Sequence, residues 1–142
     1  MYDEYWDIIS YLPKFHVSNE IGNILKEFIK YFSDKNFNIN CLCNNLGMSY
    51  NEIYEKLVTH LNLCPSKILE NIRMEYILAQ LKEDNLSINR LSSKAGYSNI
   101  RTFRRAFKRC TGVSANECRI QLLVDDRDRT QYKCYLEKIW ER

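Results

Sequence analysis

The stretch at residues 87–119 constrains the fold more than any other part of the chain. It pairs a short apolar segment with a strongly basic one on either side of Gly96. Apolar residues recur at helical spacing in both segments, and glycine most easily takes the conformation that a sharp turn between helices requires. The pattern predicts a helix-turn-helix, and its charge indicates a nucleic-acid partner.

The positive charge of the chain is concentrated in the same stretch. The 142 residues together have a formal net charge of only +3. Residues 87–122 contain eight Lys and Arg and one acidic residue, a balance of +7, whereas residues 1–35 and 36–86 each carry −2 and residues 123–142 are neutral. Such an asymmetry favours nucleic-acid binding, although a solvated basic face would give the same count.

A second copy of the pattern lies earlier in the chain. The offset between the two copies is 49 residues at first and 50 further on, so we expect one extra residue early in the second helix of the later copy. The repeated unit is a short helix, a glycine turn and a longer helix. The corresponding residues at the first offset are Ile39 and Ile88, Leu42 and Leu91, Gly47 and Gly96, and Ser49 and Ser98.

The remaining segments also predict helices. Apolar spacing indicates one helix within residues 18–32, a linker helix from 66 to about 82 that would span about 25 Å, and one within 127–140. The expected fold is all-α, with two helix-turn-helix subdomains joined by a long linker helix and helical extensions at both ends. The expected boundaries are 1–38 for the N-terminal extension, 39–65 for the first unit, 66–86 for the linker, 87–122 for the second unit and 123–142 for the C-terminal helix.

Local sequence signals mark where several of these helices begin and end. Ser49 with Glu52, and Ser114 with Glu117, have the spacing of a capping box. Pro65 suits the first turn of a helix, where its missing N–H is harmless. Asn62 stands where the other copy has a glycine, and asparagine can still take a left-handed conformation.

These motifs resemble the DNA-binding domain of AraC/XylS-type transcription regulators over residues 39–119. The departures Ser92, Ala115 and Cys118, where the family has Ala, Pro and an aromatic residue, are expected to change packing only. The second unit carries the resemblance through Ile88, Leu91, Ala95, Gly96, Tyr97, Ser98, Phe103, Phe107, Lys108, Gly112, Ser114 and Arg119. The first unit and the linker match more loosely, through Leu42, Ser49, Ile53, Leu57, Pro65, Arg73 and Leu81.

The resemblance implies sequence-specific binding of an asymmetric DNA site, with one helix of each unit in the major groove, one helical turn apart. It also implies activation of transcription through RNA polymerase. Arginine can donate two hydrogen bonds to guanine, although each arginine here could instead only neutralise phosphate. In the second unit the expected base contacts are Ile100, Arg101, Arg104 and Arg105. The expected phosphate contacts are Ser87, Lys108, Arg109 and Thr111, with Lys56 in the first unit.

The first unit is a less obvious DNA reader. The resemblance places Asn51, Tyr54 and Glu55 at base-edge positions, and asparagine and glutamate can pair with adenine and cytosine. However, phosphate repels Glu52 and Glu55, and only Lys56 compensates. The first unit is therefore either a weak reader or a surface for another partner. The alternative function is a protein-interaction module, in which the acidic first unit binds a partner regulator or chaperone and only the second unit engages DNA.

The segments outside the repeat leave two interpretations. The terminal helices either cover the core or form an interface, and exposed Tyr135 and Trp140 would favour the interface. The 38 residues before the first unit are too short for the ligand-binding domain usual in the family. We therefore expect no small-molecule effector, and control by the abundance of the protein or by another protein.

Other classes of function find little support in the sequence. There is no glycine-rich phosphate loop, nucleophile elbow or metal-ligand spacing, so we expect no enzyme activity, cofactor or metal. The six cysteines form no C-x-x-C pair, and there is neither a secretory signal nor a long apolar span, as expected of a cytoplasmic protein. Richness in Asn, Ile, Lys and Tyr suggests an AT-rich bacterial genome, and from it a virulence regulator.

Overall fold

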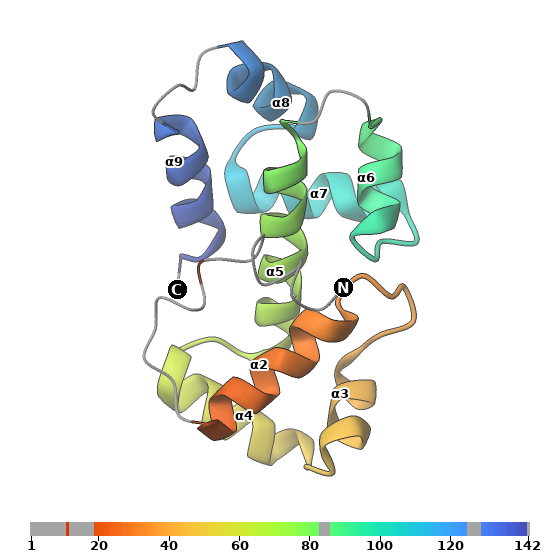
Figure 1. The fold of residues 1–142 in the computed structure, drawn as a ribbon, viewed down its shortest axis with the longest axis vertical. Helices are drawn as coiled ribbons and strands as arrows, with labels where there is room; N and C mark the ends of the chain where they lie inside the picture. The colour runs from red at the N-terminus through yellow and green to blue at the C-terminus, as the bar shows by residue number, and fades with distance from the viewer. Residues whose placement is uncertain (1–10, 12–18, 83–85, 125–128, 142) are drawn as a thin grey trace.

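The computed structural model describes residues 11, 19–82, 86–124 and 129–141, and within them every regular element is a helix. This confirms the all-α prediction (Figure 1). The parts of the expected terminal helices at residues 18 and 127–128 lie outside the described residues. The helices are α2 (Asn19–Tyr31), α3 (Ile39–Leu46), α4 (Tyr50–Leu61), α5 (Pro65–Gln80), α6 (Ile88–Lys94), α7 (Ile100–Thr111), α8 (Ala115–Val124) and α9 (Thr130–Ile139).

The linker helix α5 forms the axis of the molecule. It runs along the long dimension in Figure 1, with α2, α3 and α4 around one end and α6 to α9 around the other. The helix α2 packs on α3, α4 and α5, while α9 packs on α5, α7 and α8. The predicted arrangement of two helix-turn-helix units on a shared linker is therefore present. No helix in the described ranges is long and apolar enough to cross a membrane.

Both terminal helices pack back on the core. Phe28 on α2 is fully buried, and on the C-terminal side Tyr135 is 4% and Trp140 1% exposed. Tyr11 stacks on Trp140 with ring centroids 5.3 Å apart. Because the aromatic side chains that would mark an interface are buried, the structure favours the interpretation in which these helices cover the core.

The predicted helix boundaries of the first unit follow local chemistry. Ser49 and Glu52 form the reciprocal capping box at the start of α4. Asn62 ends α4 with a φ of 57°, which confirms the left-handed turn expected there. Pro65 is the first residue of α5, as predicted. The long linker helix therefore begins only three residues after the left-handed turn.

The extra residue of the second copy lies in the turn, so its predicted place inside the second helix is wrong. The side chain of Asn99 accepts hydrogen bonds from the amides of Arg101 and Thr102, which makes it the N-cap of α7. The equivalent cap of α4 is Ser49, 50 residues earlier. The longer turn places Gly96 against another part of the chain, as described below.

Candidate nucleic-acid interface

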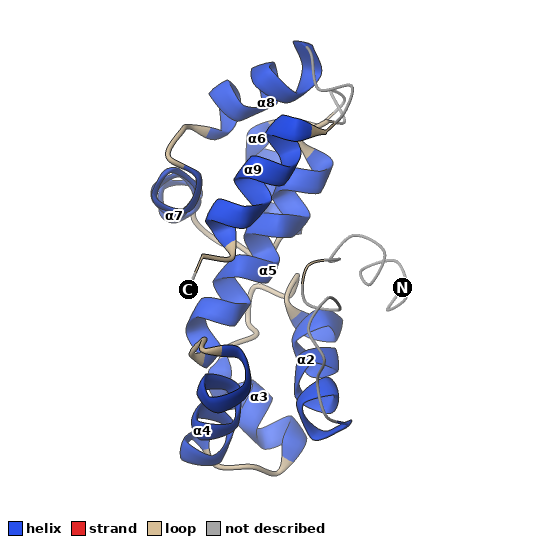
Figure 2. Ribbon diagram, turned by 90° about the vertical axis from the view of Figure 1, so that its left-hand side faces the viewer, coloured by secondary structure: helices blue, strands red, loops and turns tan. Residues whose placement is uncertain are grey.

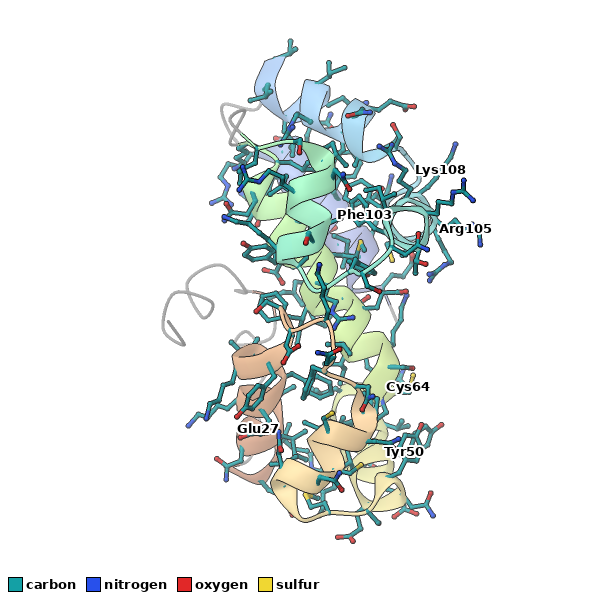
Figure 3. The ribbon with its side chains drawn as sticks, turned by 90° about the vertical axis from the view of Figure 1, so that its right-hand side faces the viewer. Glu27, Tyr50, Cys64, Phe103, Arg105 and Lys108 are labelled. Carbon is teal, nitrogen blue, oxygen red and sulfur yellow. The ribbon has the colours of Figure 1, made fainter. Side chains whose placement is uncertain are left out.

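The two helices expected to enter DNA grooves lie on the same side of α5. In Figure 2, α4 and α7 both lie to the left of α5 while α2 lies on the opposite side. Figure 3 shows the same relation from the other direction, with labelled Arg105 and Lys108 from α7 and Tyr50 from α4 at one edge. The repeat thus presents its two second helices on one face of the molecule.

The helix α7 divides sharply into a buried and a basic face. Phe103 and Phe107 are fully buried and pack on each other, with ring centroids 5.7 Å apart. The opposite side carries exposed cations at one-turn spacing. Because one face is fixed in the core, the other is held outward in a defined orientation. The exposed cations are Arg101, Arg104, Arg105 and Lys108.

This basic face is available to an anion. Within the described residues, none of the four cations forms an ion pair. Ile100, the remaining predicted base contact, is half-buried at the first position of α7. An unpaired row of guanidinium groups on a rigid helix has the chemistry that guanine edges and phosphates require.

The residues predicted to contact phosphate in the second unit differ in whether their side chains are free to do so. Ser87 is exposed and caps α6, where its hydroxyl accepts from the amide of Arg90. Arg109 instead makes two hydrogen bonds to the Glu70 carboxylate on α5, at 3.0 and 2.8 Å. This ion pair raises the pKa of Arg109 and gives its exposed guanidinium group a carboxylate partner within the chain.

The structure contradicts the prediction that the side chain of Thr111 contacts phosphate, because this side chain is fully buried. Its hydroxyl donates to the carbonyl of Phe107 over 2.8 Å and lies 3.0 Å from that of Val113. The helical period could have revealed this, since Thr111 follows the buried Phe107 by four residues and must share its face.

The exposed face of α4 has a different chemistry. Asn51, Tyr54 and Glu55 are all exposed, and the rings of Tyr50 and Tyr54 lie 6.0 Å apart. The single cation of the helix, Lys56, forms an ion pair of 2.9 Å with Glu20 on α2. Its side chain therefore contacts α2, and nothing in the structure supports the predicted contact with phosphate.

Several charged residues near the interface were not predicted as site residues from the sequence. Lys35 and Arg90 line a surface hollow that also borders Ile100 at the start of α7. Glu70 and Arg73 of the linker contact the second unit directly. Of these residues, only Arg90 could have been found from the sequence, because it lies in the basic stretch at residues 87–122. The others depend on contacts between distant segments, and no local pattern predicts those.

A family model described as a helix-turn-helix domain, of the AraC type, matches residues 42–121, more than half of the chain. The chain belongs to the AraC-type helix-turn-helix family. Its members are DNA-binding transcription regulators, and this chain has their helix-turn-helix domain. The match covers both units and the linker between them, which together form the face described above.

A curated relative supports the same assignment. The raffinose operon transcriptional regulatory protein RafR of Pediococcus pentosaceus is 32% identical over 87 residues, which are 58% of this chain. The match spans 31% of the relative, so this chain corresponds to about a third of that protein's length.

Two solved structures share the fold. The C-terminal domain of AraT, a response regulator from Geobacillus stearothermophilus, has a TM-score of 0.72 at 23% identity and covers 79% of this chain and 93% of that one. The C-terminal domain of the two-component response regulator yesN from Fusobacterium nucleatum has a TM-score of 0.68 at 19% identity and covers 72% and 99%. At these identities the likeness establishes the double helix-turn-helix architecture.

Proposed function

We propose that the chain binds an asymmetric DNA site through α4 and α7 together, each in its own major groove, and so regulates transcription. The observation that carries this proposal is that the two helices lie on the same side of α5 (Figures 2 and 3). Two readers on one side of a single chain suit two boxes on one face of the duplex, one helical turn apart.

The asymmetry of the site follows from the different chemistry of the two helices. In α7, Arg101, Arg104 and Arg105 are proposed to contact guanine or phosphate, and Ile100 a thymine methyl group. In α4, Asn51, Tyr54 and Glu55 would favour a different sequence. Outside these bases, Lys108 and the N-terminus of α6 at Ser87 are the proposed phosphate contacts.

The proposal includes activation through contact with RNA polymerase. This part rests on the common mode of action in the family, and no single residue of this chain carries it. A reporter gene with the selected site placed upstream of a weak promoter tests it. Expression should rise when the chain is supplied, and a fall would indicate repression instead.

Selection of bound fragments from a genomic DNA pool, followed by sequencing, tests the proposed site. The wild-type chain is compared with two double variants, Arg101→Ala/Arg105→Ala and Tyr54→Ala/Glu55→Ala. We expect two boxes about one helical turn apart, with each double variant losing the preference at a different box. A single box lost only with the arginine variant would mean that α4 does not read DNA.

A second candidate function is favoured by the acidic surface of the first unit. Glu52 and Glu55 are exposed on α4, and Lys56 is already paired with Glu20. In this alternative, the first unit binds a partner regulator or chaperone. The salt dependence of DNA binding separates the two, since 6–10 phosphate contacts cost about 10³–10⁵ in affinity between 50 and 200 mM salt. A chain that engages DNA through α7 alone should show a much shallower dependence.

A further inference from the structure

The two halves of the molecule touch each other beside α5, where the end of α2 meets the turn between α6 and α7. Gly96 in this turn has a φ of +98°, and a Cβ built on it would lie 2.5 Å from the carbonyl oxygen of Phe32. The backbone of the turn therefore rests directly on the backbone that follows α2. Because α2 packs on α3 and α4, the turn is connected to the first unit by a route outside the linker.

Arg73, in the middle of α5, holds this junction together. Its Nε–H donates to the carbonyl of Phe32 over 2.9 Å, and its Nη2 donates to the carbonyl of Asp34 over 3.3 Å. The same guanidinium group lies over the ring of Tyr97, 5.5 Å from its centroid. One planar side chain thus contacts the end of α2 and the turn before α7 at the same time.

The chemistry of this junction suits arginine specifically. Burial lowers the pKa of Arg73, while Tyr97 and Asp34 act in the opposite direction, and an arginine stays protonated in any protein. Its donors are arranged in a rigid plane that can serve two carbonyl groups and stack on a ring at once. The ammonium group of a lysine is a compact point charge that cannot do all three.

A second contact from α5 fixes the far end of α7. Glu70, one turn before Arg73, accepts two hydrogen bonds from Arg109 and one of 3.1 Å from Lys67. The helix α7 is therefore held near its start through Tyr97 and near its end through Arg109. With both ends attached to one linker helix, α7 has little freedom to pivot on its own.

We propose that Arg73 is a positioning residue that sets the spacing between the two DNA boxes that the chain accepts. This inference rests on the proposed function above. Adding one base pair between two boxes moves the second box by about 3.4 Å and rotates it by about 34°. A chain in which α4 and α7 are locked together cannot follow that shift, whereas a chain with a loosened junction can.

The test uses the full chain and DNA duplexes built from the selected site. One set carries both boxes with the spacer lengthened or shortened by one or two base pairs, and one duplex carries only the box recognised by α7. The variants are Arg73→Lys and Arg73→Met. The matched control is Arg119→Lys, because Arg119 Nε also donates to a backbone carbonyl, that of Leu81 over 3.1 Å, without crossing the junction.

The wild-type chain and the control should lose about tenfold or more in affinity for a one-base-pair change, since base contacts of one helix are then lost. Both Arg73 variants should bind the single box as the wild type does and lose only about threefold or less for the same change. If Arg73→Met does not fold, as judged by circular dichroism, Arg73→Lys carries the test. Equal spacing preference in wild type and variant would overturn the inference.

A different outcome would bear on the proposed function itself. If the wild-type chain shows no preference among spacers, or binds the two-box and one-box duplexes equally, the chain does not read two boxes. The role of Arg73 in spacing would then fall together with the two-box proposal. A loss of thermal stability in Arg73→Lys with unchanged spacing preference would assign it a purely structural role and contradict the inference.

Discussion

The indole N–H of Trp140 donates a hydrogen bond of 2.8 Å to a carboxylate oxygen of Glu75. Trp140 follows the last residue of α9, Glu75 lies in α5, and their side chains are 1% and 0% exposed. A buried carboxylate is costly unless hydrogen bonds satisfy it. The contact therefore attaches the C-terminal helix to the linker. If the indole donor were removed, water could not reach Glu75 to replace it.

We expect Trp140→Phe to destabilise the fold by about 1–3 kcal/mol, because a buried carboxyl group loses a hydrogen-bond donor. Urea unfolding followed by circular dichroism measures the change. The control is Tyr135→Phe, which removes a hydrogen bond to the exposed Gln121 and should cost about 0.5–1.5 kcal/mol. A cost for Trp140→Phe no larger than that of the control would contradict the assigned role of this pair.

A comparison of two glycines tests the close contact at the junction. Gly96 and Gly112 both have a positive φ, but a Cβ on Gly112 would meet nothing within 4 Å. Gly112→Ala should cost about 1–2 kcal/mol for the left-handed backbone alone. Gly96→Ala should cost about 1–3 kcal/mol more, because the methyl group would collide with the Phe32 carbonyl. Equal melting temperatures for the two variants would show that the collision is relieved at no cost.

The pH dependence of stability should reveal the Glu70 cluster. Burial raises the pKa of this carboxyl, but the hydrogen bonds and charges of Arg109 and Lys67 outweigh it and lower the pKa below its usual value of 4.5. A lowered pKa in the folded state gives a contribution that is present above about pH 4.5 and is lost as the pH falls through the folded-state pKa.

Glu70→Gln should therefore be less stable than the wild type by about 0.5–1 kcal/mol at pH 7, since Arg109 is well exposed. The difference should shrink below pH 4.5 as the wild-type carboxyl is protonated. Denaturant midpoints measured from pH 3 to 8 test this, with Glu137→Gln as a control at an exposed position of α9. A difference that stays constant with pH would rule out an electrostatic contribution from Glu70.

Thiol labelling tests the placement of the cysteines. Burial and then the charge of Glu70 raise the pKa of Cys110 to about 11, and Cys118 is fully buried, whereas Cys134 is exposed on α9. Because the thiolate is the reactive form, iodoacetamide at pH 8 should modify Cys134 well before Cys110 or Cys118. Peptide mapping by mass spectrometry gives the order. Early modification of Cys110 in the folded protein would contradict the structure near Glu70.

The sequence predicted those features that local chemistry determines. The capping box at Ser49, the left-handed Asn62 and the helical start at Pro65 each depend on a few neighbouring residues, and all three are present. The repeat supplied the architecture, because two copies of one pattern must form two copies of one unit. The basic face of α7 was equally predictable, since its period separates Phe103 from the arginines.

What the sequence missed depends on contacts between segments far apart in the chain. Arg109 and Lys56 looked like free cations, but each has a carboxylate partner, Glu70 and Glu20, which lie 39 and 36 residues away in the chain. Arg73 could be matched to the family, yet its bridging position appears only when α2 and the turn at Gly96 lie together. Helical periodicity gives the face of each residue, but it does not say which helix covers that face.

Hydroxyl-radical footprinting on the selected DNA site is the measurement that tests the account most directly. Strand cleavage is recorded with and without the chain at physiological salt. We expect two protected segments on the same face of the duplex, about 10 base pairs apart, because α4 and α7 project from one side of α5. Protection of a single segment would contradict it and would leave α7 as the only helix that enters DNA.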